Sequence, residues 1–258
     1  DDYRQVAETN AAFALERLRR DGRPSTGSGQ RLLRSYKDGQ AKLLGYLEDY
    51  AFLIDGLLAL YEATFQRRWL DEARSLAEAM VDLFWDEAKG VFFDTGRDHE
   101  SLVVRPRDTF DNATPSGSSV AMDVLLRLGI LLGEGEYTRR ATAALRSLAE
   151  LLPRYPSGFG HWLCALDFYL STPQEVAIVG RREDAATRAL LGVVFGRYLP
   201  NKVMAGYEPG DAEAARGIPL LEGREGSDGR PTAYVCQSYV CQLPATEPEV
   251  LARQLVNG

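Results

Sequence analysis

Histidine and cysteine are scarce in this sequence, with two His and three Cys among 258 residues. His99 and His161 form no metal-ligand cluster of familiar spacing, and we expect neither a metal site nor a cofactor. No G-x-G-x-x-G motif follows the strand-like run that ends at Gly180, which argues against dinucleotide binding. Three cysteines are too few for a disulfide scaffold, so a reducing, cytoplasmic setting is the simpler expectation.

The pair Cys236 and Cys241 lacks the C-x-x-C spacing of a redox motif. Residues at an odd-numbered offset face opposite sides of an unbroken strand, so direct pairing of the two sulfurs needs a bulge or a turn. The sequence therefore favours two buried free thiols, with a disulfide or a metal site as alternatives.

Long apolar runs are absent as well. No run approaches the roughly 18–20 residues that span a bilayer, and the acidic start DDYRQVAETN is unlike a signal peptide, so no membrane association is expected. The net charge of −7 argues against nucleic-acid binding, which needs clustered Lys and Arg. The chain does not begin with Met, and we expect it to start inside a longer gene product or after processing.

Helices dominate the first two thirds and repeat every 68 residues or so. Residues 45–64 are apolar nearly all round and predict a buried inner helix, whereas residues 69–86 are apolar on one face and predict an outer helix. A shift of 68 places Asp55 on Asp123 and predicts a second inner helix at 116–132 and a second outer helix at 137–152. Residues 160–170 add a third inner helix. Residues 3–20 are expected to form a first outer helix that no inner helix precedes. Because outer and inner helices pair, this order predicts a truncated assembly.

The remaining segments predict loops and strands. Residues 22–40 are polar and glycine-rich and predict a loop, while residues 90–95 and 101–106 predict a β-hairpin. After residue 172 the pattern changes to strand (175–180), helix (184–198) and strand (202–207), a unit whose strands should be parallel. A further strand is expected at 233–236 and a final helix at 245–256. The expected fold is mainly α, with a helical-hairpin domain at 1–172 and a small α/β segment at 173–258.

Four strings together carry a family resemblance: GYLEDYAFLIDGLLALYEAT, DNATPSGSSVAMDVLLRLG, EVAIVG and AYVCQSYVCQLP. In this order they resemble the thioredoxin-domain-linked family of bacterial YyaL and the animal spermatogenesis-associated proteins, over nearly the whole chain. The resemblance implies about half of an (α/α)6 toroid, similar to N-acylglucosamine 2-epimerases and six-hairpin glycosidases. It also implies a partner in the missing N-terminal portion, which holds the rest of the toroid and a thioredoxin-like domain. Ser118 departs from the family pattern, which has Asn there.

Candidate site residues lie where the inner helices begin. Glu48, Asp49 and Asp111 are candidate acids and bases, although helix starts also favour negative charge for structural reasons. Polar or aromatic neighbours that suit sugar binding, or a core equally well, are Tyr46, Tyr50, Asn112, Ser116, His161 and Trp162.

Fold-level similarity favours a carbohydrate-active or carbohydrate-binding protein with a small sugar as ligand, and sugar isomerase or epimerase chemistry is the most concrete hypothesis. The alternative is a non-catalytic scaffold or interaction module that positions a thioredoxin-like domain or a client protein. The two hypotheses differ in one structural expectation. An enzyme needs the carboxylates to converge on an open pocket, whereas a scaffold needs an exposed apolar surface.

Overall fold

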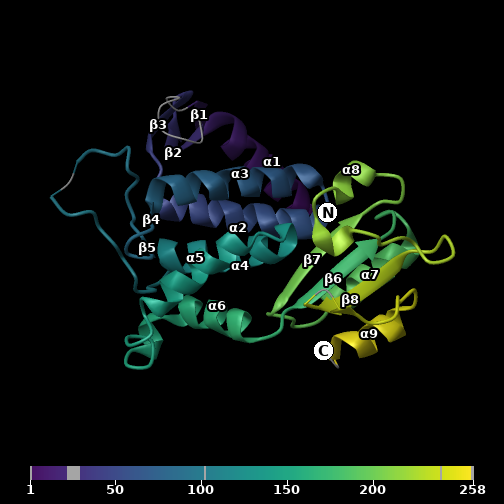
Figure 1. Cartoon of the computed structure of the whole chain (residues 1–258). Coiled ribbons are helices and arrows are strands. Elements are labelled where there is room, and N and C mark those ends of the chain that lie inside the picture. Colours follow the sequence, from purple (N-terminus) through teal and green to yellow (C-terminus); the bar gives the residue numbers. More distant parts are fainter. Residues whose placement is uncertain (1, 22–29, 102, 239, 257–258) are drawn as a thin grey trace. The chain divides into compact units, whose positions relative to one another are not determined.

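Helices make up most of the N-terminal part, as the repeat predicts. The computed structural model describes residues 2–21, 30–101, 103–238 and 240–256 (Figure 1). The predicted outer and inner helices are α1 (Asp2–Arg17), α2 (Leu47–Thr64), α3 (Arg67–Phe84), α4 (Gly117–Leu132), α5 (Gly135–Arg146) and α6 (Gly160–Leu170). The mainly helical fold is therefore confirmed. The expected alternation of outer and inner helices fails at both ends, because α1 buries only Ala11 and α6 buries only Trp162, Ala165 and Phe168. The completion of these hairpins into an (α/α)6 toroid stays a prediction.

The hairpin of α2 and α3 shows how the two helix types pack (Figure 1). Each helix buries nine residues: α2 leaves Phe52 and Ala59 exposed, and the buried face of α3 includes Trp69 and Met80, so α2 is not the more buried helix that the sequence predicts. Between them Phe65 adopts a left-handed conformation with φ of 57° and donates its backbone N–H to the carbonyl of Tyr61. This cap ends α2 and lets α3 begin two residues later.

Residues 30–44 form a β-hairpin instead of the predicted loop. Strands β2 (Gln30–Lys37) and β3 (Gln40–Leu44) pair antiparallel, and β1 (Arg19–Asp21) pairs with the other edge of β2. Asp38 and Gly39, with φ of 52° and 77°, supply the left-handed turn that a two-residue hairpin needs. The loop prediction is wrong over 30–37, and the STGSG segment of it lies outside the described residues.

The predicted hairpin of 90–95 with 101–106 is also wrong. Strand β5 (Val91–Phe92) pairs with β4 (Trp85–Asp86), directly after α3, and the described residues of 101–106 form no strand. The Trp85 and Phe92 rings, 4.9 Å apart, pack edge to face at this pairing. Val103 and Val104, which belong to the second predicted strand, are exposed to solvent instead.

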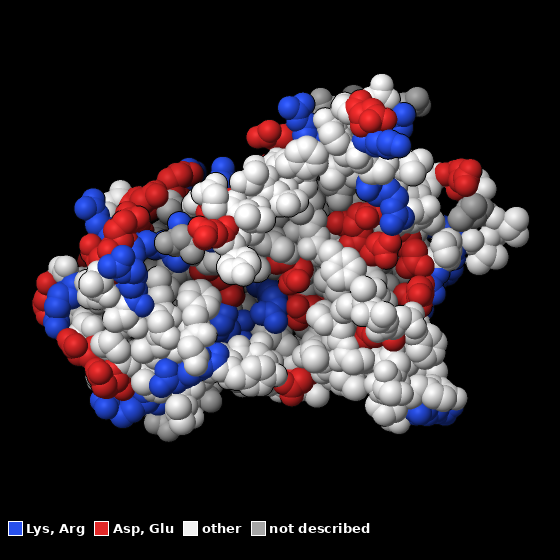
Figure 2. Space-filling view, turned by 180° about the vertical axis from the view of Figure 1, so that it is seen from behind, with Lys and Arg blue, Asp and Glu red and all other residues white. Residues whose placement is uncertain are grey.

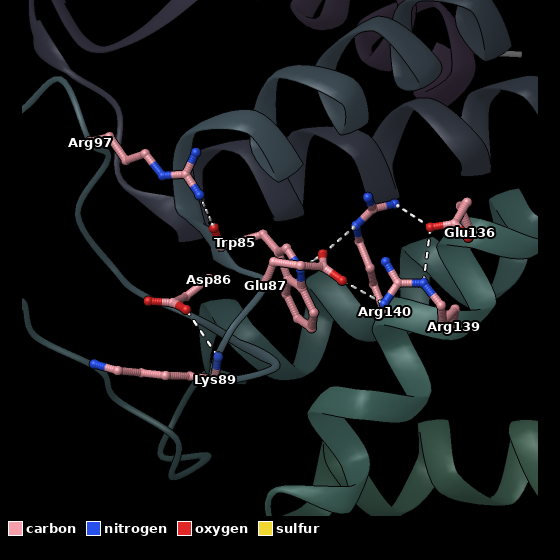
Figure 3. Close-up of polar contacts among 8 residues, drawn as sticks. All are labelled: Trp85, Asp86, Glu87, Lys89, Arg97, Glu136, Arg139 and Arg140. Atoms are coloured by element: carbon pink, nitrogen blue, oxygen red, sulfur yellow. Dashed lines mark hydrogen bonds and ion pairs between the residues drawn. The ribbon is translucent and has the colours of Figure 1, made fainter.

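Ion pairs connect this hairpin to α5, as Figure 3 shows. The Glu87 carboxylate lies 2.7 Å from Arg139 Nη1 and accepts a hydrogen bond from the Trp85 indole. Arg139 and Arg140 also contact Glu136 one turn earlier on their own helix. The hydrogen bond from Arg139 lowers the pKa of Glu87. All these groups are exposed enough that the network orients the hairpin more than it stabilises the fold.

Packing divides the chain into two compact units. One comprises Asp1–Leu126 with Gly135–Ala165, and the other comprises Arg127–Glu134 with Leu166–Gly258. The predicted domain division after residue 172 stays a prediction. None of the described helices is long and apolar enough to cross a membrane. On the face drawn in Figure 2, blue Lys and Arg side chains are interspersed with red Asp and Glu side chains.

The second unit contains the predicted α/β segment. Strands β6 (Gln174–Val179) and β7 (Lys202–Tyr207) are parallel and joined by α7 (Ala185–Phe195), as the handedness rule predicts. Strand β8 (Thr232–Gln237) pairs antiparallel with the other side of β6, giving the sheet order β7-β6-β8-β9. Helices α8 (Ala212–Ala215) and α9 (Pro248–Val256) complete the unit. Every residue of β6 is buried, as expected for a central strand.

Cys236 and Cys241 form a disulfide, so the favoured prediction of free thiols is wrong. The chain turns at Ser238, whose φ is 49°, and returns as β9 (Val240–Cys241). Cys236 and Cys241 are therefore opposite each other in an antiparallel pair. The turn removes the opposite-face problem that an unbroken strand would impose.

Candidate functional site

The starts of two inner helices lie against each other in the first unit. Gly117, the first residue of α4, packs so closely that a Cβ there would lie 2.9 Å from the backbone nitrogen of Glu48 in α2. A side chain at this position would collide with backbone, so glycine permits the approach. The loops at residues 46–49 and 111–117, which the repeat relates to each other, meet for this reason.

A cavity of about 320 Å³ opens beside this contact. Its size lies in the range of small-molecule sites. Four predicted site residues line it: Tyr46, Glu48, Asn112 and Ser116. The lining also includes groups that the sequence did not single out, namely Arg34, Asp94, Asp108, Phe110 and Thr114.

Arg34 organises one wall of the cavity. Its guanidinium donates a hydrogen bond of 3.1 Å to the Glu48 carboxylate and lies 4.6 Å from the centre of the Tyr46 ring. Half of the Glu48 side chain stays exposed, so one face of its carboxylate remains free to meet a ligand. Arg34 lies in β2, in a segment that was predicted to be a loop.

Asp49 holds the start of α2. Its carboxylate accepts the backbone N–H of Tyr46 at 2.7 Å and lies 3.7 Å from Arg34. Burial raises the pKa of Asp49, while the bond from Tyr46 and the charge of Arg34 oppose that rise. Asp49 does not line the cavity. Its geometry is that of a helix cap.

Asp94 is the cavity carboxylate that sequence reasoning missed. Burial raises its pKa above the usual range, and the negative charges of Asp108 and Glu48 add to the rise. The backbone N–H of Asp108 donates to its carboxylate at 2.7 Å and partly offsets the effect. The backbone carbonyl of Asp94 accepts the N–H of Leu47, which ties it to the start of α2. Three acidic residues, Glu48, Asp94 and Asp108, thus line one cavity, and the pKa of Asp94 is raised.

Asp111 serves as a structural link between loops. One carboxylate oxygen accepts the backbone N–H of Ser116 and the hydroxyl of Ser119, each at 2.8 Å. The other accepts the backbone N–H groups of His161 and Trp162, at 2.8 and 3.3 Å, which are in the first turn of α6. Both oxygens are engaged, and Asp111 does not line the cavity.

Tyr50, Trp162 and His161 also lie away from the cavity lining. Tyr50 is 1% exposed, its hydroxyl oxygen accepts the N–H of Leu32, and burial raises its pKa to about 12. Trp162 is 1% exposed, and its indole N–H donates to the carbonyl of Thr109 at 2.9 Å. The His161 side chain is partly buried, and its Nε2 meets no hydrogen-bond partner in the part of the chain that the structure describes. The two aromatic rings are therefore core residues.

No known family model matches the chain. It is 34% identical to human spermatogenesis-associated protein 20 over 214 residues, which are 82% of this chain and 27% of that protein. The rat protein of the same name is 34% identical over 217 residues, with the same coverage. A Caenorhabditis elegans protein, the uncharacterized B0495.5, is 26% identical over 208 residues, or 81% of this chain and 28% of that protein. The chain thus spans about a quarter of the length of these relatives.

Proposed function

The chain belongs to the family of spermatogenesis-associated protein 20, and on that premise we propose that it is the part of a longer protein that binds a small carbohydrate. The ligand occupies the cavity at the starts of α2 and α4. The chemistry performed there is proton transfer of the sugar isomerase or epimerase kind. The observation that supports this proposal is that Glu48 and Asp94 line one open cavity, together with Asp108.

The cavity lining supports a polyhydroxylated ligand. Hydroxyl groups accept and donate hydrogen bonds, and the carboxylates, the guanidinium of Arg34 and the amide of Asn112 offer both kinds of partner. A sugar also has an apolar face, which suits the rings of Tyr46 and Phe110. A sugar thus offers both hydroxyl groups for the polar lining and an apolar face for the rings.

Asp94 and Glu48 take different roles in this proposal. Asp94 has a raised pKa and exchanges a proton with the ligand as a general acid or base. Glu48, fixed by Arg34, and Asn112 orient the hydroxyl groups. Asp49 and Asp111 support the site by holding the helix starts. The remainder of the longer protein completes the walls of the cavity.

The test is a thermal-shift screen of neutral and phosphorylated monosaccharides on the full-length protein. A binding sugar raises the melting temperature of the parent. Asp94→Asn and Glu48→Gln abolish the shift, whereas Glu78→Gln, on the exposed face of α3, retains it. A sugar-induced shift that survives both cavity substitutions refutes the proposed site, and the absence of any shift across the screen refutes the proposed ligand.

A scaffold role is the second candidate. The observation that favours it is the exposure of two adjacent apolar side chains, Val103 at 104% and Val104 at 77%. Such residues cost solvation free energy unless a partner covers them. The partner in this proposal is the rest of the same protein. Its separately produced N-terminal portion should bind this chain, and Val103→Ser with Val104→Ser should weaken that binding. Unchanged binding contradicts the candidate.

A further inference from the structure

The disulfide of the second unit has one accessible and one inaccessible sulfur. Cys236 is 1% exposed and pairs on both sides, with Glu175 of β6 and Cys241 of β9, whereas Cys241 in the edge strand β9 is only partly buried. A thiolate that approaches from solvent therefore reaches Cys241 first. Attack on this sulfur makes Cys236 the leaving group.

An arginine lies against both sulfurs. Nη2 of Arg224 is 2.8 Å from Sγ of Cys241 and 3.8 Å from Sγ of Cys236. The backbone carbonyl of Arg224 accepts the hydroxyl of Tyr207, and its guanidinium lies 5.1 Å from the centre of the Tyr234 ring, so its position is fixed from two sides. Among the described residues no carboxylate forms an ion pair with Arg224.

A cation beside a sulfur stabilises the thiolate over the thiol. A structural disulfide has no use for such a group, because neither sulfur carries charge while the bond is intact. Arg224 also contacts the Tyr234 ring and both sulfurs of the intact disulfide, but its charge interacts more strongly with a thiolate than with an uncharged sulfur. Arg224 therefore favours opening of the disulfide and the anionic sulfur that results.

We propose that Cys236 and Cys241 form a thiol–disulfide exchange site whose reaction partner is a dithiol, and that Arg224 stabilises the thiolates it releases. This activity is independent of the carbohydrate proposal. It needs no residue of the cavity in the first unit.

The exchange proceeds in two displacements. The first thiolate of the dithiol attacks Sγ of Cys241, forms a mixed disulfide there and breaks the bond to Sγ of Cys236, which leaves as a thiolate. The second thiolate of the dithiol then attacks its own sulfur in the mixed disulfide and releases Cys241 as a thiolate. Two electrons pass from the dithiol to the protein, and the two protons that the dithiol loses reach Cys236 and Cys241 through water. In reverse, the same steps let the protein reduce a disulfide.

The first experiment measures reduction of the folded protein by dithiothreitol. The background is Cys164→Ser, which removes the third, unpaired cysteine, and the free thiols are counted by mass after alkylation. The parent should be reduced without loss of helical circular dichroism. Arg224→Gln should slow reduction about three- to tenfold, because it removes the cation beside the leaving thiolate. Arg224→Lys should recover most of the rate, and Arg216→Gln, which removes an exposed arginine, should leave it unchanged.

Three results of this experiment overturn the proposal. Reduction that occurs only after the protein is denatured makes the disulfide structural. A rate in Arg224→Gln equal to that of the parent removes the role of the cation. Two free thiols in the air-oxidised protein remove the disulfide itself.

The second experiment identifies the attacked sulfur. Each cysteine is left alone in turn, and its reaction with the chromogenic disulfide 5,5′-dithiobis(2-nitrobenzoate) is followed by absorbance. Cys241 in the Cys236→Ala variant should react at least about tenfold faster than Cys236 in the Cys241→Ala variant, because thiol reactivity follows exposure. Equal rates, or a faster Cys236, contradict the proposed direction of attack.

Discussion

Two loops of the first unit can be compared because the 68-residue repeat relates them. Each has two adjacent polar residues near an inner-helix start: Glu48 and Asp49 are in the first turn of α2, and Asp111 and Asn112 lie in the loop before α4. In each loop one carboxylate accepts backbone N–H groups, and the other polar residue lines the cavity. The member that holds the backbone is Asp in both cases. The short Asp side chain can accept backbone N–H groups a few residues away, from Tyr46 to Asp49 and from Ser116 to Asp111. A residue type that the sequence suggests as catalytic therefore fixes helix starts.

Removal of Asp111 tests the structural half of this comparison and should have the largest effect. Asp111→Ala leaves the backbone N–H of Ser116 and two N–H groups of α6 without their acceptor, while the Ser119 hydroxyl keeps the Ser116 carbonyl. The loss of several charge-assisted hydrogen bonds in a partly buried site should lower the free energy of unfolding by about 3 kcal/mol. Urea denaturation measures it. Asp71→Ala, which removes only an exposed pair with Arg67, is the control and should cost no more than about 0.5 kcal/mol. A loss of that small size in Asp111→Ala would place its carboxylate outside the structural network.

Gly117 tests whether the two loops must touch. Gly117→Ala places a Cβ 2.9 Å from the backbone nitrogen of Glu48, and the strain should destabilise the protein by about 2 kcal/mol. The matched control is Gly56→Ala in the middle of α2, where a Cβ meets nothing within 4 Å. There the gain in helix propensity should stabilise the protein by about 0.5–1 kcal/mol.

Opposite signs for these two glycine variants, measured by thermal unfolding, are the expected outcome. The same sign in both would mean that the starts of α2 and α4 separate easily. The cavity would then be a loose gap between helices rather than a formed site.

Asp49 should matter less than Asp111 because it holds one helix start rather than two. Asp49→Ala removes the acceptor for the Tyr46 N–H and should cost about 1 kcal/mol, typical of a lost cap. Glu48→Ala, next to it, breaks only a half-exposed pair with Arg34 and should change stability by less. Chemical denaturation of both variants gives the order, and a larger loss at Glu48 would reverse the division of roles.

The sequence predicted the helices well because their apolar periodicity is local. Inner helix 45–64 was expected, and α2 spans Leu47–Thr64. The hairpin at 30–44 was missed although Asp38 and Gly39 carry its turn, because the glycine-rich residues before it favoured a loop over the whole stretch. The disulfide was disfavoured because the rule for strand faces assumed a strand without a turn at Ser238.

The site was harder to predict than the fold. Its position at the inner-helix starts followed from the repeat, and Tyr46, Glu48, Asn112 and Ser116 do line one cavity. Asp94 could not be found in this way, because it reaches the cavity through a backbone bond to Leu47, 47 positions earlier. Local patterns carry no information about such a contact. The only hint was a lone carboxylate after the apolar run Val91, Phe92 and Phe93.

The smallest expected effect compares the cavity carboxylate Asp94 with Asp111, because substitution at Asp94 should change stability with the opposite sign. The folded state raises the pKa of Asp94, so above the pKa of the unfolded chain the ionised carboxylate costs stability. This cost is absent below the unfolded pKa, grows as pH rises to the folded pKa, and is full above it. Asp94→Asn keeps an acceptor for the Asp108 N–H without the charge, and it should therefore stabilise the protein slightly at pH 7 but not at pH 3. Denaturation of parent and variant at both pH values measures the difference. Such a cost would set Asp94 apart from Asp111, which stabilises the fold, and would agree with the proposed role of Asp94 in proton transfer. If Asp94→Asn destabilises the protein at pH 7, Asp94 joins Asp49 and Asp111 as a structural carboxylate, and the cavity loses its acid.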